Sequence, residues 1–206
     1  MDTTTTTSSS LHVITGPMFA GKTSRLIHYL TTFMHLGKKV LAIKHDKDNR
    51  YEEEEKDNKE KQTVWTHDQR GFPALQTNSL SEVRKNPLYQ QARVVGIDEG
   101  QFFTELVKEV LRMVEEDHKI VYVSGLDLDS SRRLFGEIGH LASLADSHER
   151  LYGICALCED GITKALYTRA LVSKRDQILV GGAETYMPVC RRHYRSDVKK
   201  EKEVGS

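Results

Sequence analysis

Hydrophobic and polar positions near the start of the chain predict a strand, a helix and a second strand. Residues 11–15 (LHVIT) predict a short buried strand. After a turn that contains glycines, apolar residues recur at helical spacing and predict a helix over residues 23–36, ended by Gly37; its apolar face consists of Leu26, Ile27, Leu30, Phe33 and Met34. Residues 39–44 predict the second strand. A strand, a helix and a strand in this order form a parallel βαβ unit.

The same alternation returns in the middle of the chain. Residues 92–97 predict a third strand, and residues 119–124 predict a fourth. Between them a helix is predicted over residues 103–116, with an apolar stripe made of Leu106, Val107, Val110, Leu111 and Val114. Strands that alternate with helices are typical of an α/β fold, in which helices cover both faces of a parallel sheet.

The pattern changes after about residue 150. Short runs rich in β-branched and aromatic residues (LYGIC, ITKALYTR and QILVGG) are separated by turns and predict a small β-rich unit. Residues 52–63 contain no apolar side chain, so we expect them to form a surface loop. We therefore expect a disordered tail over residues 1–10, an α/β domain over 11–150, a β-rich domain over 151–194 and a flexible tail over 195–206.

Length and charge narrow the class of protein. The chain has 206 residues, of which 38% are hydrophobic, enough for one sizeable core with a small appendage. No apolar run approaches the length of a membrane span, so we expect no membrane partner. The 30 basic and 30 acidic side chains balance, which argues against a broad nucleic-acid surface but not against a local phosphate site. The first ten residues resemble neither a signal peptide nor a transit peptide, and we expect a cytoplasmic protein.

A phosphate-binding loop is predicted between the first strand and the first helix. The sequence fits G-x-x-x-x-G-K-[ST] and consists of Gly16, Pro17, Met18, Phe19, Ala20, Gly21, Lys22 and Thr23. Glycine lets the backbone turn several N–H groups toward phosphate oxygens, and the N-terminus of the next helix faces the same anion. We expect Lys22 to reach the outer phosphates and the Thr23 hydroxyl to hold Mg²⁺. The predicted fold class is thus an α/β fold of the P-loop NTPase type.

Two acidic residues, Asp98 and Glu99, directly follow the third predicted strand. In a protein with a phosphate loop, a carboxylate at this place can hold Mg²⁺, directly or through water. A second carboxylate beside it can accept a proton from an attacking hydroxyl group. We expect Asp98 to hold the metal and Glu99 to act as the general base.

Three cysteines and one histidine have the spacing of a zinc site. Cys155-x-x-Cys158 and Cys190-x-x-His193 each bring two donors together on a tight turn. Four such donors close a tetrahedral Zn²⁺ site with no open position, so the expected role is structural. The alternative is a redox-active C-x-x-C pair, which usually begins a thioredoxin-like βαβ unit, whereas here no helix is predicted to follow.

Taken together, these motifs resemble the type II thymidine kinases, the compact tetrameric group related to the human cytosolic enzyme. The combination of GIDEGQFF with GGAETY and the paired cysteines is highly specific for this family. The resemblance extends from about residue 11 to residue 194 and includes GPMFAGKT (16–23), KDNRY (47–51), WTHD (65–68), GIDEGQFF (96–103), GLD (125–127), RRLFG (132–136), C-x-x-C (155–158), GGAETY (181–186) and CRRHY (190–194).

The resemblance implies transfer of the γ-phosphoryl group of ATP to the 5′-hydroxyl of thymidine, with Mg²⁺, to give dTMP for nucleotide salvage. It implies that Asp48, Arg50, Asp98 and Gln101 join residues 16–23 around ATP, with Asp48 also on magnesium. It also implies a homotetramer, feedback inhibition by dTTP, and a lasso loop, clipped by zinc, that closes over the nucleoside. The implied nucleoside pocket draws on several segments: Phe102, Leu126, Ser130, Phe135, Thr168, Gln177, Ile178, Leu179, Val180, Gly181 and Tyr186.

The sequence departs from the family pattern at several positions. Ala20 replaces the usual serine, with little expected effect because the backbone binds the phosphates. Ser130 stands where relatives have an aromatic residue beside the nucleoside, which bears on the tightness toward thymidine and on the acceptance of deoxyuridine or deoxycytidine. His193 replaces a cysteine as the fourth zinc donor and is an equally competent ligand. Residues 52–63 lengthen a connection, and we assign them no function.

Two other classes of protein share part of this pattern. A nucleotide kinase or a GTPase would also carry a phosphate loop, but the guanine-reading Asn-Lys-x-Asp motif of GTPases is absent. A zinc-ribbon module that binds nucleic acid is supported only by CRRHYR and the lysines near it. Solvated basic side chains are the favoured explanation of that segment, and salt-sensitive binding to DNA or RNA would distinguish the two.

Overall fold

The computed structural model describes residues 8–46, 63–65, 71–171 and 184–195. Its largest element is a seven-stranded sheet with the strand order β3-β4-β2-β5-β6-β1-β7. Six of these strands are parallel, and β3 pairs antiparallel with β4 at one edge. The strands are β1 (Ser10–Thr15), β2 (Val40–His45), β3 (Thr63–Trp65), β4 (Gly71–Thr77), β5 (Val94–Ile97), β6 (Ile120–Gly125) and β7 (Ser147–Arg150).

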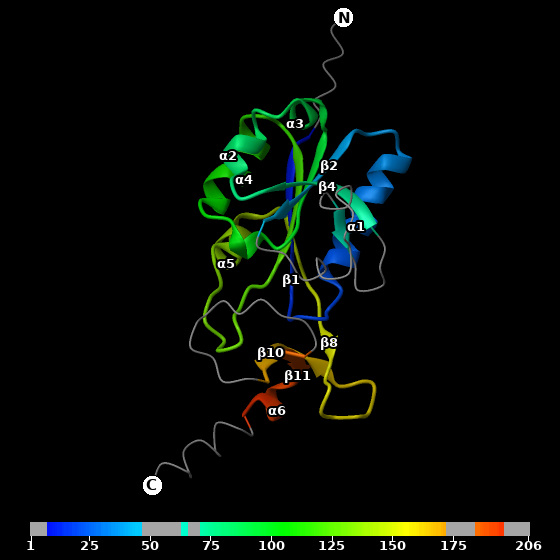
Figure 1. Ribbon diagram of the computed structural model, residues 1–206, viewed down its shortest axis with the longest axis vertical. Helices are drawn as coiled ribbons and strands as arrows, with labels where there is room; N and C mark the ends of the chain where they lie inside the picture. The colour runs from blue at the N-terminus through cyan, green and yellow to red at the C-terminus, as the bar shows by residue number, and fades with distance from the viewer. Residues whose placement is uncertain (1–7, 47–62, 66–70, 172–183, 196–206) are drawn as a thin grey trace, which may run out of the picture.

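Helices cover both faces of this sheet (Figure 1). On one face, Leu26 and Leu30 of the first helix pack in a buried cluster with Ile14 of β1. On the other face, Val110 belongs to a buried cluster that includes Val95 of β5. The sheet is therefore buried on both sides, which confirms the predicted α/β fold class. The helices are α1 (Lys22–His35), α2 (Leu80–Val83), α3 (Pro87–Gln91), the 3₁₀ turn η1 (Gly100–Phe102), α4 (Leu106–Glu115) and α5 (Ile138–Leu144).

The boundaries of the predicted elements differ from the observed ones by three residues or fewer. The largest difference concerns the helix predicted over residues 103–116, which begins only at Leu106. Its start is set by Glu105, whose left-handed φ of 55° cannot belong to a right-handed helix. Gly37, with φ of 71°, ends α1 as predicted: its N–H donates to the Met34 carbonyl oxygen at 2.9 Å.

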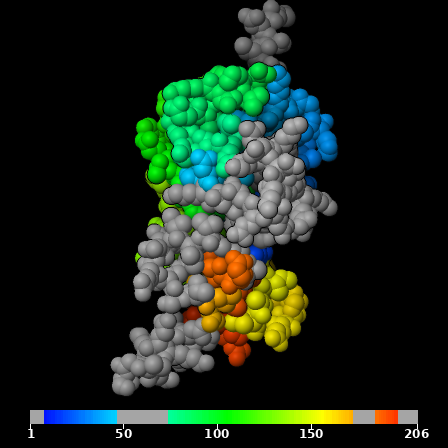
Figure 2. Space-filling model, in the orientation of Figure 1, coloured from blue at the N-terminus to red at the C-terminus, as the bar shows by residue number. Residues whose placement is uncertain are grey.

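The described residues after position 150 form short strands and one short helix, in agreement with the β-rich pattern. We term its described residues, 151–171 and 184–195, the C-terminal module. The module lies at one end of the molecule (yellow to red in Figures 1 and 2). It is joined to the carboxyl end of β1, where Leu151 N–H donates to Thr15 O at 2.8 Å. Its elements are β8 (Gly153–Ile154) paired with β9 (Lys164–Ala165), β10 (Tyr167–Ala170) paired with β11 (Tyr186–Val189), and α6 (Arg191–Arg195).

Among the residues that the structure describes, no helix has both the length and the apolar character needed to cross a membrane.

Candidate phosphate site and metal centre

The loop of residues 16–23 connects β1 to α1 at the carboxyl end of the sheet. Gly16 and Gly21 have φ of 147° and 81°, which other residues rarely adopt. A Cβ atom at Gly16 would also lie 2.5 Å from the carbonyl oxygen of Leu151. Helix α1 begins directly after Gly21 and has no acidic residue in its first turn, so its N-terminus keeps its positive partial charge. A glycine-containing turn that leads into a helix N-terminus is the geometry that binds anions in proteins, and it occurs here at the predicted position.

The side chain of Lys22 lies back across this loop. It is only 7% exposed, and its Nζ donates to the carbonyl oxygen of Pro17 at 2.9 Å. A buried ammonium group on the same loop as a helix N-terminus favours the binding of an anion there.

Asp98 lies at the point where three elements meet. Thr23 Oγ1, at the start of α1, donates to Asp98 Oδ2 at 2.9 Å. The hydroxyl of Ser124, near the end of β6, donates to the other carboxylate oxygen. The sequence predicts that Thr23 and Asp98 act together, but it does not predict the contact of Ser124 with Asp98. Ser124 could have been found from its position near the end of the predicted strand that neighbours β5, because the carboxyl ends of parallel strands lie at one edge of the sheet.

Glu99 adopts a left-handed conformation, with φ of 50° and ψ of 44°, and it is 5% exposed. Such a backbone conformation costs energy for a residue that is not glycine, and it is often found at functional sites. Gln101 Nε2 donates to Glu99 Oε2 at 2.5 Å, while Gln101 Oε1 accepts from the backbone N–H of Leu126 at 3.0 Å. Gln101 thus joins Glu99 to the segment that follows β6.

Four residues of the predicted nucleoside pocket have contacts within two separate parts of the chain. Phe102 and Phe135 pack edge to face, with ring centroids 5.7 Å apart. Thr168 on β10 is buried, and its Oγ1 accepts from the N–H of Met18 in the phosphate loop at 2.9 Å. Tyr186 is buried on β11, opposite Ala170 of β10. The predicted site residues Asp48, Arg50, Gln177, Ile178, Leu179, Val180 and Gly181 lie outside the described residues.

The loop that carries Ser130, residues 127–135, is held closed by a buried carboxylate. Asp129 Oδ1 accepts from the backbone N–H groups of Ser131 at 2.8 Å and Arg133 at 2.9 Å. Its Oδ2 accepts from Arg133 Nε at 2.9 Å. The sequence does not indicate this role for Asp129, which appears only once the turn that it closes is formed. We term this segment the 127–135 loop.

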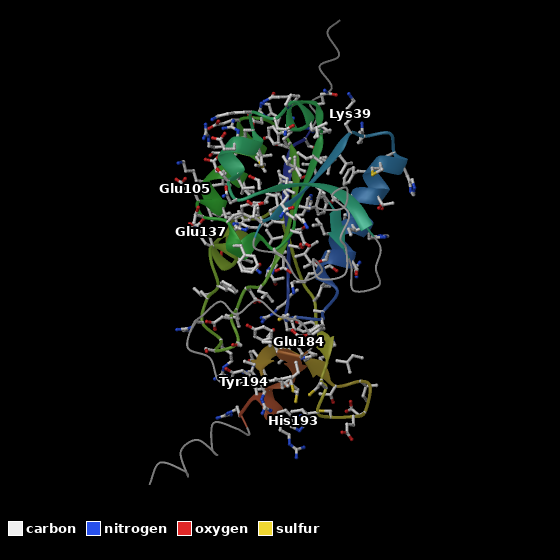
Figure 3. The ribbon with its side chains drawn as sticks, viewed as in Figure 1. Lys39, Glu105, Glu137, Glu184, His193 and Tyr194 are labelled. Carbon is white, nitrogen blue, oxygen red and sulfur yellow. The ribbon has the colours of Figure 1, made fainter. Side chains whose placement is uncertain are left out.

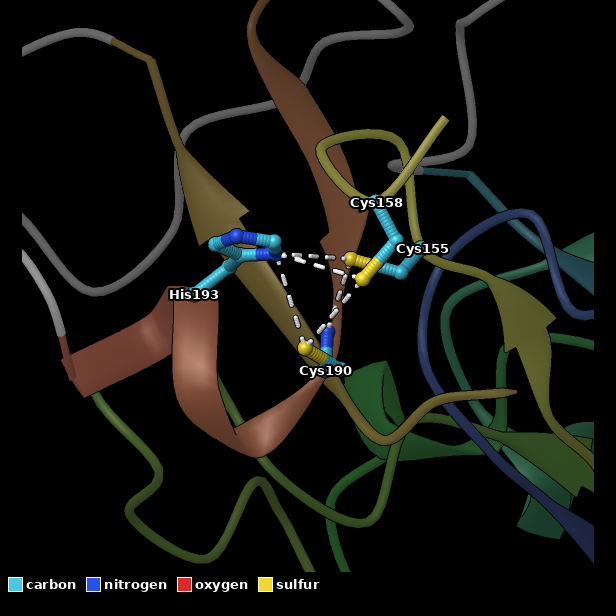
Figure 4. Close-up of side chains that lie close together, drawn as sticks. All are labelled: Cys155, Cys158, Cys190 and His193. Atoms are coloured by element: carbon cyan, nitrogen blue, oxygen red, sulfur yellow. Dashed lines mark hydrogen bonds between the residues drawn. The ribbon is translucent and has the colours of Figure 1, made fainter. Parts of the chain in front are cut away.

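The four predicted metal donors gather in the C-terminal module (Figure 4). His193 Nδ1 lies 3.4 Å from the sulfur atoms of Cys155 and Cys158 and 3.6 Å from that of Cys190. The Cys158 and Cys190 sulfurs are 3.8 Å apart. A tetrahedral zinc ion with usual bond lengths separates two sulfurs by about 3.8 Å and a sulfur from a nitrogen by about 3.6 Å. The donor set therefore fits zinc in both chemistry and spacing.

The thiols of this cluster differ in acidity. At Cys155 burial opposes ionisation, but hydrogen bonds from the Cys190 N–H and from His193 outweigh it and lower the pKa to about 6. Burial raises the pKa of Cys158 to about 11. A divalent cation among these sulfurs deprotonates the thiols that coordinate it. These surroundings thus favour the thiolate form of Cys155 and the neutral thiol form of Cys158.

Comparison with known proteins shows the family to which this chain belongs. A family model described as "Thymidine kinase" matches residues 9–194. "Thymidine kinase a" of Arabidopsis thaliana is 36% identical over 203 residues, which cover 96% of this chain and 81% of the relative. The thymidine kinase of Fowlpox virus is 36% identical over 190 residues, which cover 92% of this chain and 99% of the relative. "Thymidine kinase, cytosolic" of Cricetulus griseus is 36% identical over 91% of this chain and 74% of the relative. The matches confirm the resemblance drawn from the motifs, and the chain belongs to the thymidine kinase family.

Proposed function

We propose that this chain phosphorylates thymidine, transferring the γ-phosphoryl group of ATP to the 5′-hydroxyl and giving dTMP for nucleotide salvage. The observation that carries the proposal is the hydrogen bond from Thr23 of the phosphate loop to Asp98, with the buried Glu99 next in the sequence, in a chain of the thymidine kinase family. Phosphoryl transfer needs mainly positioning and charge stabilisation. This edge of the sheet offers both.

The donor side is assigned to the phosphate loop. The backbone of residues 16–23 and the N-terminus of α1 would hold the phosphates of ATP, with Lys22 on the outer ones. The Thr23 hydroxyl and the Asp98 carboxylate are hard oxygen donors that already lie 2.9 Å apart, which suits Mg²⁺. We assign Asp48 to the metal and Arg50 to the phosphates as well. Bound Mg²⁺ would neutralise charge that develops on the phosphates.

The acceptor side is assigned to Glu99 and the residues around it. Glu99 would accept the proton of the 5′-hydroxyl while Gln101 holds its carboxylate in place. Flat aromatic walls suit a nucleobase, and backbone groups suit its polar edge. We assign the nucleoside pocket to Phe102, Leu126, Ser130, Phe135, Thr168, Gln177, Ile178, Leu179, Val180, Gly181 and Tyr186.

The remaining assignments concern the whole protein. We infer a kinase domain over residues 11–150 and a zinc-binding lasso domain over 151–194, with tails on either side. Zinc held by the three cysteines and His193 is structural, because all four positions are taken by protein donors. By analogy with the family, we also propose a cytoplasmic homotetramer that dTTP inhibits.

A nucleoside panel tests the proposed function. Purified protein is incubated with ATP, Mg²⁺ and one of thymidine, deoxyuridine, deoxycytidine or dTMP, and products are separated by liquid chromatography. We expect thymidine to give dTMP with the highest kcat/KM of the panel. Turnover of dTMP without turnover of any nucleoside would instead make the protein a nucleotide kinase.

A further inference from the structure

We propose that Tyr194 and Arg132 form a clamp that fixes the 127–135 loop to the metal cluster of the C-terminal module. In this proposal, which rests on the proposed function, they are positioning residues for the thymidine side of the reaction. Neither residue belongs to the phosphate site, and neither is a metal donor.

Tyr194 makes the direct connection. It follows the metal donor His193 on α6, and Figure 3 shows the two side chains in the same module. Its ring packs against the buried cluster of Cys155, Val189 and Cys190. Its hydroxyl donates to the backbone carbonyl oxygen of Ser130 at 2.9 Å, across 64 residues of sequence. One side chain thus contacts both the metal cluster and the outer turn of the loop.

Arg132, in the 127–135 loop, contacts aromatic rings of the C-terminal module. Its guanidinium carbon lies 4.3 Å from the ring centroid of Tyr194 and 5.5 Å from that of Tyr167. The two rings are 5.3 Å apart, so the cation rests on a pair of aromatic faces. Arg132 also has a left-handed φ of 61°. Surrounding contacts must hold an arginine in that conformation, and the two rings provide them.

The clamp lies at the tip of a loop whose ends border the predicted nucleoside pocket. At one end, the Leu126 N–H is bonded to Gln101, which also holds Glu99. At the other end, Phe135 packs against Phe102. A shift of the tip would therefore move a wall of the nucleoside pocket while the phosphate loop keeps its own contacts.

The short helix α6 connects the metal cluster to the clamp, because it carries both His193 and Tyr194. A five-residue helix is not stable alone, and here donors at Cys190 and His193 fix its start and its middle. Ordering of these donors orients Tyr194 toward Ser130. We infer that the metal cluster acts on the substrate pocket through this contact, rather than only by stabilising its own module.

Two variants, Tyr194→Phe and Arg132→Met, test the clamp. Tyr194→Phe removes one hydroxyl and keeps the ring, and Arg132→Met removes the cation and keeps most of the stem. The matched control is Tyr152→Phe, in the same module, whose ring lies under Lys164 Nζ at 4.9 Å and not against the loop. The readouts are the thymidine Kd by calorimetry, KM for thymidine and for ATP, kcat, and zinc content by native mass spectrometry.

We expect each clamp variant to raise the thymidine Kd and KM by about three- to tenfold, the range of one lost neutral hydrogen bond for Tyr194→Phe and of one lost cation–π contact for Arg132→Met. The ATP KM, kcat and zinc content should change less than about twofold, and the double variant should show less than the product of the two effects. Tyr152→Phe should match the wild type.

Two results overturn the inference. Wild-type thymidine affinity in both clamp variants would show that the contacts position nothing. Equal losses for ATP and thymidine, together with lost zinc, would show a purely structural role. If the wild-type chain itself neither binds nor phosphorylates thymidine, the proposed function fails and the inference falls with it, an outcome that the wild-type measurement separates from the other two.

Discussion

Glu99, Arg132 and Gly136 all have left-handed backbone angles, with φ of 50°, 61° and 58°. All three border the segments that form the candidate site. Glycine adopts this conformation at little cost, whereas the two charged residues depend on contacts around them. The role of Gly136 is spatial as well, because a Cβ atom there would lie 2.4 Å from the carbonyl oxygen of Gln101.

Gly136→Ala should therefore displace Gln101, which holds both Glu99 and Leu126. We expect kcat/KM for thymidine to fall by about tenfold or more, since small displacements of reacting groups cost much of the rate. The matched control is Gly37→Ala, where φ is also left-handed at 71° but no atom lies within 4 Å of the added Cβ. It should lower stability by about 1 kcal/mol and leave activity unchanged. Steady-state kinetics and thermal unfolding of both variants check this, and equal activities would contradict it.

At the scale of elements, the pattern of nearby residues predicts helices and strands that depend on local contacts. It does not predict strands that form only by pairing with residues far away in the sequence. The βαβ unit around α1 carries its own signal in its apolar spacing and Gly37. The edge strand β7 (Ser147–Arg150) consists of polar residues and exists because it pairs with β1, far away in the sequence. The strand β4 contains Pro73, which weakens any strand pattern, and its place is set by pairing with β2.

The same distinction separates the parts of the candidate site. The phosphate loop and the metal donors are contiguous or regularly spaced motifs, so the sequence predicts them. Ser124, Asp129 and Gln101 act through neighbours brought together by the sheet and by the 127–135 loop. The family resemblance already names Leu126 and Ser130 as pocket residues, but the hydrogen bonds of their backbone groups form only when those segments meet, which no spacing along the chain indicates.

A metal-content measurement tests the C-terminal module. Wild-type protein should carry one zinc ion per chain in native mass spectrometry. Cys158→Ser should lose it, because a closed site needs all four donors, and the module should then be cut rapidly by protease. His193→Cys should retain zinc, and His140→Ala, on the distant helix α5, should match the wild type. Full zinc occupancy in Cys158→Ser would refute the assigned donor set.

The carboxylate of Asp117 joins three helices at the opposite end of the sheet from the phosphate loop. Asp117, just after α4, accepts two bonds of 2.7 Å from Arg84, which ends α2. It also accepts from the Tyr89 hydroxyl of α3 at 2.6 Å. Hydrogen bonds from Arg84, against the opposing effect of burial, hold the pKa of Asp117 below its ordinary value of 3.8.

Because folding lowers the pKa of Asp117, the ionised carboxylate stabilises the folded protein at any pH above the ordinary pKa of the group. This stabilisation is lost as the pH falls through the lowered pKa of the folded state. Asp117→Asn should lower the unfolding midpoint at pH 7, and its difference from the wild type should narrow as the pH approaches 3. Glu82→Gln removes an exposed carboxylate paired with Lys85 and should change the midpoint little. A difference that stays constant with pH would contradict the role of the charge.

At the scale of the whole molecule, the large sheet and the C-terminal module meet along the phosphate loop. Thr168 of the module bonds to Met18 of that loop, and Tyr194 bonds to the 127–135 loop. The candidate site therefore depends on both parts of the chain. Figure 3 shows His193 and Tyr194 at the end of the molecule opposite Lys39.

The family also leads us to expect an assembly of four chains. Analytical ultracentrifugation at micromolar concentration should give a mass four times the 23.5 kDa of the chain. A mass that stays at one or two chains as the concentration is raised would refute the tetramer without affecting the assignment of the site.

The central claim is that Glu99 is the base in phosphoryl transfer to thymidine, and replacing its carboxylate tests this most directly. Initial rates of dTMP formation from thymidine and ATP are compared for wild type, Glu99→Gln and the exposed α4 control Glu115→Gln. We predict that Glu99→Gln lowers kcat by about 10²-fold or more, while its thermal midpoint and the kcat of Glu115→Gln stay near the wild-type values. Turnover near the wild-type rate in a folded Glu99→Gln protein would contradict the account.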